Sequence, residues 1–212
     1  MSHPVTVPLP HYILAGGQSR RFGSDKARHL IGGKPMISRV AEAFSGVASA
    51  TFVVAQRAGQ YDDLGLTTLA DDVPGAGPLA GLRSALRHEA ARQAANADPA
   101  PPPADSTWIL LTSCDLVAPD AQLLEPLRAA VGPNHQAAVY RRASWYEPFP
   151  GLYRLGLAND LDEMGIFNRG SFQRLFLHLG TSLSTNSLPQ GTPCLDMDTA
   201  PHCGKTCETL NK

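Results

Sequence analysis

A segment near the start of the chain combines adjacent glycines with three basic residues. It begins at Leu14 and reads LAGGQSRRFGSDK, and its basic residues are Arg20, Arg21 and Lys26. Glycine lets the backbone approach a ligand and adopt positive φ angles, and exposed N–H groups in such a turn attract anions. Guanidinium groups match phosphate oxygens, while a lysine ammonium acts as a point charge. The segment therefore predicts a loop that binds a nucleoside triphosphate together with a metal ion.

Two familiar phosphate-binding motifs do not account for this loop. The dinucleotide pattern Gly-x-Gly-x-x-Gly is absent, because Gly16 and Gly17 are adjacent and Gly23 comes too late. The Walker pattern requires Gly-Lys-Ser/Thr, but Gly33-Lys34 is followed by proline. The remaining alternative, a glycine turn with solvated arginines, does not explain so long a run of constrained residue types.

A second segment, residues 71–82 (DDVPGAGPLAGL), is rich in small residues and opens a helix near Pro78. Small residues let a base and ribose lie against the backbone, and a helix N-terminus favours anions. A plain Asp/Pro/Gly turn is the alternative, and the segment alone would favour it.

A third candidate is Asp115, in the segment LTSCDL that follows the most apolar strand of the chain. Open α/β sheets bind ligands at this end of their strands. A carboxylate there can hold magnesium, which takes protein and triphosphate oxygens together. Asp120 provides a cap for the next helix, so Asp115 is available for the metal.

The elements that position these residues alternate between strands and helices. Expected strands cover residues 11–15, 51–55, 66–70, 108–112, 136–141, 148–153 and 194–197. Expected helices cover residues 35–44, 79–93, 119–131 and 171–179. This alternation predicts a mostly parallel sheet covered on both faces. Residues 94–106 (AANADPAPPPADS) are expected to form an exposed loop inserted between a helix and the central strand.

Composition predicts one globular domain over residues 1–212, because 43% of the residues are hydrophobic and 17% are charged. The net charge is −1, which argues against a nucleic-acid or membrane partner. No long apolar run and no signal peptide is evident, so a cytoplasmic location is expected. The cysteines fit no zinc pattern, so free thiols are expected at Cys114, Cys194, Cys203 and Cys207.

The first segment resembles the signature Leu-Ala-Gly-Gly-x-Ser-x-Arg-x-Gly-x-Asp-Lys of the molybdenum cofactor guanylyltransferases, the MobA family. Every fixed position is matched from Leu14 to Lys26. The resemblance implies an α/β, Rossmann-like three-layer nucleotidyltransferase fold with a mostly parallel central sheet. It also implies that Arg21 and Lys26 hold phosphates, and that the nucleotide lies against Leu14, Ala15, Gly16 and Gly17.

Later segments resemble the family less closely. The acidic loop and Gly-Pro-Leu-Ala-Gly segment imply guanine-nucleotide contacts at Asp71, chosen over Asp72 on spacing, and at Gly77, Pro78 and Leu79. The family motif Cys-Asp-x-Pro implies that Asp115 binds nucleotide and magnesium, although Val117 replaces the proline.

Two further segments stay ambiguous. Residues 147–153 resemble a strand on the acceptor side, but a core strand with an edge proline fits at least as well. Asp198 is either a second magnesium ligand or part of a turn.

The implied activity is magnesium-dependent transfer of GMP from GTP to molybdenum-molybdopterin, giving molybdopterin guanine dinucleotide and diphosphate. Positioning and electrostatics carry such a reaction, with Arg21, Lys26 and Asp115 as its catalytic residues. The implied partners are GTP, a molybdopterin-type acceptor, and proteins of molybdenum insertion or molybdoenzyme maturation. The alternatives are a related enzyme that uses CTP or a sugar-phosphate acceptor, and a non-catalytic GTP-binding regulator.

Overall fold

The computed structural model describes residues 8–16, 25–96, 107–165, 170–189 and 192. Several sequence predictions lie outside these residues. They concern the strand at 194–197, three of the cysteines, most of the segment 94–106, and the site residues Gly17, Arg21 and Asp198.

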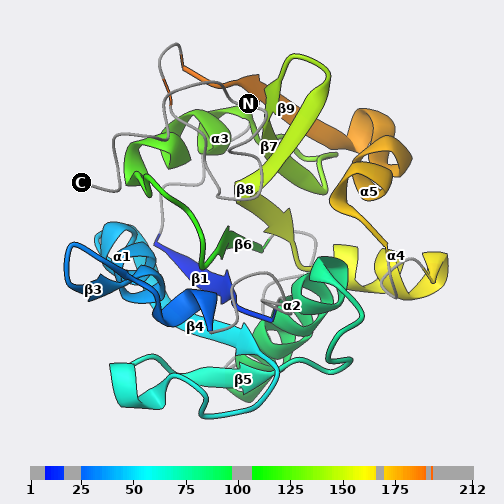
Figure 1. Ribbon diagram of the computed structural model, residues 1–212. Helices are drawn as coiled ribbons and strands as arrows, with labels where there is room; N and C mark the ends of the chain where they lie inside the picture. Colours follow the sequence, from blue (N-terminus) through cyan, green and yellow to red (C-terminus); the bar gives the residue numbers. More distant parts are fainter. Residues whose placement is uncertain (1–7, 17–24, 97–106, 166–169, 190–191, 193–212) are drawn as a thin grey trace.

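A seven-stranded sheet forms the centre of the protein, in the order β5-β4-β1-β6-β8-β7-β9 (Figure 1). Its strands are β1 (Leu9–Leu14), β4 (Ala48–Ala55), β5 (Thr68–Ala70), β6 (Trp108–Ser113), β7 (Ala137–Arg142), β8 (Trp145–Arg154) and β9 (Leu183–Ser187). β8 runs antiparallel to β6 and β7, and the other neighbouring strands are parallel. The predicted α/β fold with a mostly parallel sheet is therefore confirmed.

Helices cover both faces of this sheet (Figure 1). α1 (Met36–Ala43) and α3 (Leu124–Ala130) pack on one face. α2 (Pro78–Ala95), α4 (Leu157–Met164) and α5 (Phe172–Leu179) pack on the other. The three layers arise because β1 and most of β6 are buried, so both sides of the central strands need apolar cover.

Short elements complete the fold. A two-stranded hairpin, β2 (Leu30–Ile31) and β3 (Lys34–Pro35), precedes α1. Single 3₁₀ turns are η1 (Lys26–Arg28), η2 (Asp62–Leu64), η4 (Ala121–Leu123) and η5 (Gly180–Ser182).

The sequence predictions were wrong in several details. The expected helix at 119–131 is a 3₁₀ turn followed by α3, which begins only at Leu124. Asp120 caps the 3₁₀ turn, because its carboxylate accepts a hydrogen bond from the Gln122 amide. The expected loop at 94–106 begins later, because α2 continues to Ala95. α4 and β9 were not predicted. Both are short, and only Leu157, Ala158 and Leu161 of α4 are buried. β9 is mostly polar and lies at the edge of the sheet.

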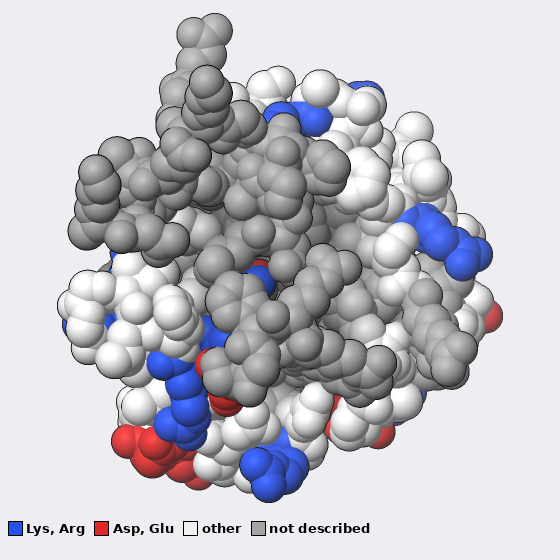
Figure 2. Space-filling view, viewed as in Figure 1, with Lys and Arg blue, Asp and Glu red and all other residues white. Residues whose placement is uncertain are grey.

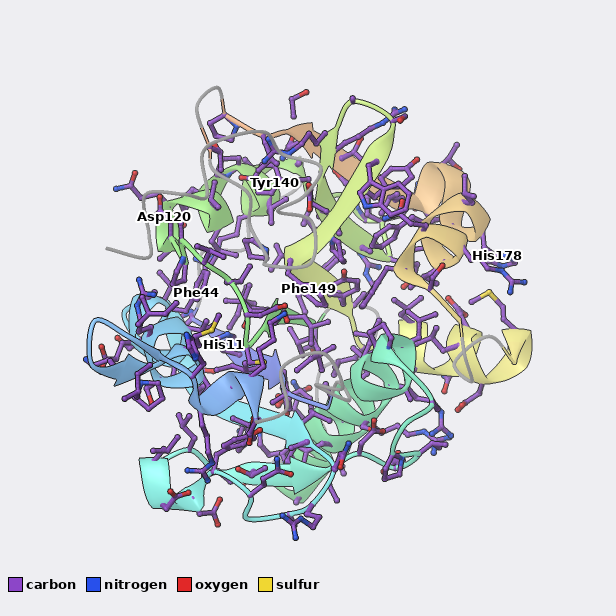
Figure 3. The ribbon with its side chains drawn as sticks, viewed as in Figure 1. His11, Phe44, Asp120, Tyr140, Phe149 and His178 are labelled. Carbon is purple, nitrogen blue, oxygen red and sulfur yellow. The ribbon has the colours of Figure 1, made fainter. Side chains whose placement is uncertain are left out.

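The core beneath α1 contains a histidine. His11 is fully buried beside Phe44, with ring centroids 5.3 Å apart (Figure 3). Its Nε2 atom lies 2.8 Å from the Thr112 hydroxyl, and burial lowers the pKa of His11 to about 3. A neutral imidazole therefore joins β1 to β6 within the core.

Charged side chains of both signs lie around the face shown in Figure 2, without a patch of one sign among the residues described there. Among all the residues that the structure describes, no helix is long and apolar enough to cross a membrane.

Candidate active site

Three loops meet at the carboxyl ends of neighbouring parallel strands. They follow β1, β5 and β6, and each continues the pairing of its strand by one further backbone hydrogen bond. The Ala15 amide donates to Val54, the Asp71 amide to Ala55, and the Cys114 amide to Leu14, at 2.9, 2.7 and 3.0 Å. The sequence predicted ligand binding in each loop, and the fold places all three at one edge of the sheet, which is the edge that binds ligands in open α/β folds.

Lys26 and Asp115 form an ion pair at this edge. The Lys26 Nζ atom lies 2.6 Å from Oδ2 of Asp115, and the two side chains are only 12% and 10% exposed. The hydroxyl of Ser113 donates a hydrogen bond to the other carboxylate oxygen. Two predicted catalytic residues are thus in contact and mostly shielded from water. Such a pair offers both a cation for phosphate and an anion for a metal.

The surroundings of Asp115 fit a magnesium site of a common kind. Among the described residues, no group of three or more His, Cys, Asp or Glu side chains could hold a metal ion. Mg²⁺ does not require such a group, because it usually keeps several waters and binds one or two carboxylates plus substrate phosphates. A single carboxylate at the ligand-binding edge of the sheet meets this requirement.

Asp71 and Asp72 point to different surroundings. Oδ1 of Asp71 accepts hydrogen bonds from the Ser84 hydroxyl and the Val73 amide, at 2.9 and 3.1 Å. Its Oδ2 lies 4.0 Å from the position that a Cβ on Gly16 would occupy. Asp71 is buried, whereas Asp72 is half exposed and pairs with Arg83. The structure thus brings Asp71, the residue chosen from the sequence, beside the glycine loop.

The start of α2 lies in the same region. Gly77 precedes the helix with φ 105°, a left-handed value that favours glycine, and Pro78 takes the first helical position. Leu79 is fully buried. One turn further on, a Cβ on Gly81 would lie 3.0 Å from Cδ2 of Leu14. The glycine therefore lets the helix pack closely on the strand that carries the phosphate loop.

Cys114, next to the magnesium candidate, is a buried free thiol. Burial, with the neighbouring Asp115 carboxylate, raises its pKa well above the ordinary value. Because the thiolate is the reactive form, Cys114 is a packing residue rather than a nucleophile.

The strand at 147–153 lies within β8, which is a central strand and not an edge. β6 pairs only with residues 151–154 of β8, so the prolines at 148 and 150 lie beyond the end of that pairing. This arrangement explains how a central strand tolerates prolines, which cannot donate to a sheet. The alternative role of the segment on the acceptor side stays a prediction.

Two residues near Lys26 were missed as parts of the site. Asp25 caps η1, and Tyr61 donates a hydrogen bond to its carboxylate. Asp25 belongs to the matched signature, which was a signal. Tyr61 lies in the loop after β4, and no local pattern identifies it.

Comparisons with known proteins identify the family of the chain. The sequence profile of the MobA-like NTP transferase domain family matches residues 11–179. A protein of Opitutus terrae named "Probable molybdenum cofactor guanylyltransferase" is 32% identical over 66% of this chain and 64% of its own length. A molybdenum cofactor guanylyltransferase of Sinorhizobium fredii is 35% identical over 72% of this chain and 66% of its own. The chain thus spans slightly less than two thirds of each relative.

A solved structure shows the same fold. It is the molybdopterin-guanine dinucleotide biosynthesis protein A of Archaeoglobus fulgidus, 21% identical, with a TM-score of 0.59 over 84% of this chain and 83% of that one. The family profile covers most of the chain, including the glycine loop, Lys26, Asp71 and Asp115. The chain therefore belongs to the MobA-like NTP transferase domain family.

Proposed function

We propose that this protein is a molybdenum cofactor guanylyltransferase, which transfers GMP from GTP to molybdenum-molybdopterin. The observation that carries the proposal is the shielded Lys26–Asp115 pair beside the glycine loop. The guanylyltransferase names of the Opitutus and Sinorhizobium relatives support the choice of nucleotide and acceptor.

The reaction needs no nucleophile from the protein. An oxygen of the terminal phosphate of the acceptor attacks the α-phosphorus of GTP, the bond from that phosphorus to the bridging oxygen breaks, and diphosphate leaves. The protein must align the two phosphates and neutralise their repulsion, so positioning and electrostatics supply the rate. This requirement matches a site made of a glycine loop, cations and carboxylates.

The residues divide this work between them. The backbone at residues 14–17 faces the nucleotide, and Lys26 with Arg21 holds the phosphates that depart as diphosphate. Asp71 and the turn at residues 77–79 hold the ribose and base. Asp115, with Asp198 as a candidate second ligand, would hold magnesium, which neutralises phosphate charge.

The contact between Lys26 and Asp115 has a consequence for substrate binding. Without nucleotide, each group neutralises the other at 2.6 Å. When the triphosphate enters, its oxygens provide a new partner for the ammonium, and the carboxylate becomes available to a metal ion. The pair thus compensates two mostly buried charges until the substrate replaces it.

Diphosphate release tests the proposal. Purified protein is supplied with magnesium and a molybdenum-molybdopterin acceptor, and GTP is compared with CTP, ATP and UTP. Turnover with GTP alone is expected. Turnover with CTP would overturn the base assignment, and GTP binding without diphosphate release from any acceptor would favour a non-catalytic regulator. The cytoplasmic location and the maturation partners stay predictions.

A further inference from the structure

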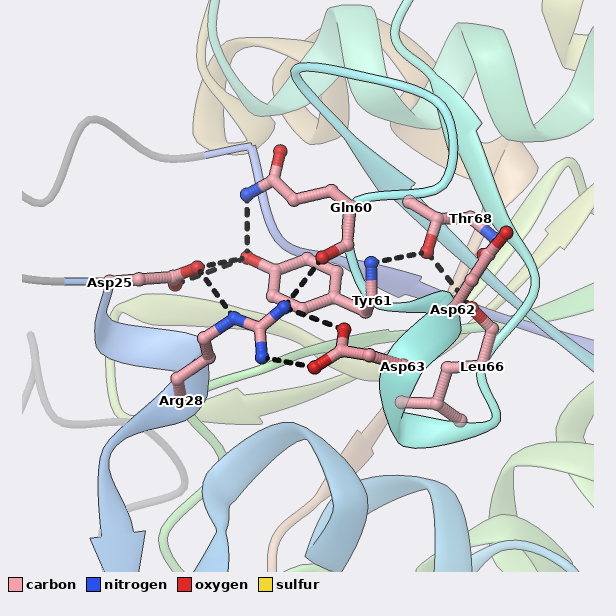
Figure 4. Close-up of polar contacts among 8 residues, drawn as sticks. All are labelled: Asp25, Arg28, Gln60, Tyr61, Asp62, Asp63, Leu66 and Thr68. Carbon is pink, nitrogen blue, oxygen red and sulfur yellow. Dashed lines mark hydrogen bonds and ion pairs between the residues drawn. The ribbon is translucent and has the colours of Figure 1, made fainter.

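The buried side chain of Tyr61 forms hydrogen bonds with Asp25, the residue that precedes Lys26. The side chain is fully buried, and its hydroxyl lies 3.0 and 3.1 Å from the two carboxylate oxygens of Asp25 (Figure 4). The Gln60 side-chain amide donates a hydrogen bond to the same hydroxyl at 3.0 Å. Burial and Asp25 raise the pKa of Tyr61 well above its ordinary value, so the hydroxyl keeps its proton and donates a hydrogen bond to the carboxylate.

Asp25 in turn fixes the 3₁₀ turn η1. One of its carboxylate oxygens accepts a hydrogen bond from the Ala27 amide at 3.0 Å, which caps the turn at its start. Lys26 is the first residue of that turn, and its ammonium reaches Asp115. The carboxylate that Tyr61 contacts therefore sets the backbone from which Lys26 extends.

Arg28 attaches the other end of the turn to the loop after β4, which also carries Tyr61. Its guanidinium forms two hydrogen bonds of 2.8 Å with the carboxylate of Asp63 and one of 2.7 Å with the Gln60 carbonyl oxygen. It also lies over the Tyr61 ring, 5.2 Å from the centroid. Both ends of η1 are thus attached to the loop after β4 (Figure 4).

The loop that carries Tyr61 is itself held in place. The Tyr61 amide donates to the Thr68 hydroxyl at 3.1 Å, and that hydroxyl donates to the Leu66 carbonyl oxygen at 2.9 Å. The Thr68 amide donates to the side chain of Asp62 at 3.0 Å. Because Thr68 is the first residue of β5, the contacts run from a sheet strand through Tyr61 to the turn.

We propose that Tyr61 is a positioning residue, which acts through Asp25 to hold Lys26 where it meets the phosphates of the nucleotide. The backbone position of Lys26 matters because a charged group acts on a phosphate only when it is placed accurately, and a displacement of about 1 Å can weaken its effect strongly. The inference rests on the proposed function, because it requires Lys26 to bind the nucleotide.

A double-mutant cycle with Lys26 tests this role by the dissociation constant of magnesium-GTP, which needs no acceptor. Tyr61→Phe removes the hydroxyl and keeps the ring. It is expected to weaken GTP binding about five- to tenfold in the wild-type background. In a Lys26→Ala background the same substitution is expected to have no further effect on GTP affinity, because the Tyr61 hydroxyl acts on the nucleotide only through the Lys26 side chain.

Tyr140→Phe is the matched control. Tyr140 is also fully buried, and its hydroxyl donates a hydrogen bond of 2.7 Å to the carbonyl oxygen of Leu123, a residue of η4 and not of η1. It is expected to lower the melting temperature while leaving GTP affinity unchanged. A Tyr61→Phe variant with wild-type affinity, or with an equal loss in both backgrounds, would overturn the positioning role.

Arg28→Ala provides a second route if Tyr61→Phe does not fold. The Arg28 side chain is 39% exposed, so its removal releases the same turn at lower cost to the core. It is expected to weaken GTP binding in the wild-type background only. Full GTP affinity in Lys26→Ala itself would contradict the proposed function. A weakened Lys26→Ala with no effect of Tyr61→Phe or Arg28→Ala would contradict only the inference about Tyr61.

Discussion

The ammonium of Lys26 lies 2.6 Å from the carboxylate of Asp115, although 89 positions separate the two residues in sequence. One follows β1 and the other follows β6, and these strands are adjacent and parallel. Removing one partner of a shielded ion pair leaves the other without compensation, which costs more than the pair itself contributes. Variants of this pair must therefore be chosen to separate activity from folding.

Asp115→Asn is expected to lower guanylyl transfer by at least about 100-fold, because the amide has no charge with which to hold a metal ion. The amide keeps an oxygen that can accept the Lys26 hydrogen bond, so the fold should survive. Diphosphate release and a thermal melt provide the measurements. The control is Asp120→Asn, since asparagine caps a helix as well as aspartate and Asp120 caps η4. Normal turnover in Asp115→Asn would exclude Asp115 as the metal ligand.

Asp71→Asn is expected to raise the KM for GTP about tenfold, because the carboxylate is buried beside the glycine loop. Asp72→Asn is the matched control. Asp72 is 46% exposed and its contact with Arg83 is long, at 3.5 Å, so its substitution is expected to remove little stabilisation. Steady-state kinetics of both variants decide the assignment. A higher KM for GTP in Asp72→Asn alone would show that Asp72, and not Asp71, contacts the nucleotide.

Gly81→Val is expected to destabilise the protein by about 1–3 kcal/mol and to weaken GTP binding, because its Cβ would press on Leu14. Gly46→Val is the control, since a Cβ on Gly46 meets nothing within 4 Å and its φ is not left-handed. Chemical denaturation and GTP titration measure the two effects. Equal stability of both variants would show that α2 does not depend on this close approach.

His11 is expected to make the protein sensitive to acid. An unfolded histidine has a pKa of 6.5, and burial lowers that of His11 to about 3. Above pH 6.5 both states are neutral and the full stability is present. As the pH falls from 6.5 towards 3, only the unfolded chain binds the proton, so the free energy of unfolding falls by up to about 1.4 kcal/mol per pH unit.

His11→Gln, which does not titrate, is expected to flatten this decline. The measurement is denaturant unfolding at intervals between pH 7 and pH 5, for the wild type and the variant. A wild-type slope in His11→Gln would mean that other groups bind the proton.

The places of Gly16 and Asp115 at the carboxyl ends of β1 and β6 could be predicted from the sequence because each residue follows an apolar strand closely. Parallel neighbouring strands bring their carboxyl ends to one edge, so the meeting of these loops could be anticipated as well. The choice between Asp71 and Asp72 rested on spacing, and only the contacts of their side chains distinguish the two environments.

Tyr61, α4 and β9 could not be predicted for three different physical reasons. Tyr61 gains its role from a contact with Asp25, 36 positions away, that no local pattern contains. α4 buries little more than Leu157, Ala158 and Leu161, so its apolar periodicity is short. In β9 only Ser184 is buried, because the strand lies at the edge of the sheet and has no apolar alternation.

β6 begins at Trp108, and Asp115 follows the opposite end of the strand. The residues that flank the segment 97–106, Asn96 and Thr107, therefore lie at the edge of the sheet remote from the Lys26–Asp115 pair. A fluorophore or affinity handle attached at the exposed Asn96 would therefore report on the protein from the end of the sheet opposite to the Lys26–Asp115 pair. The length of β6 separates the attachment point at Thr107 from Asp115.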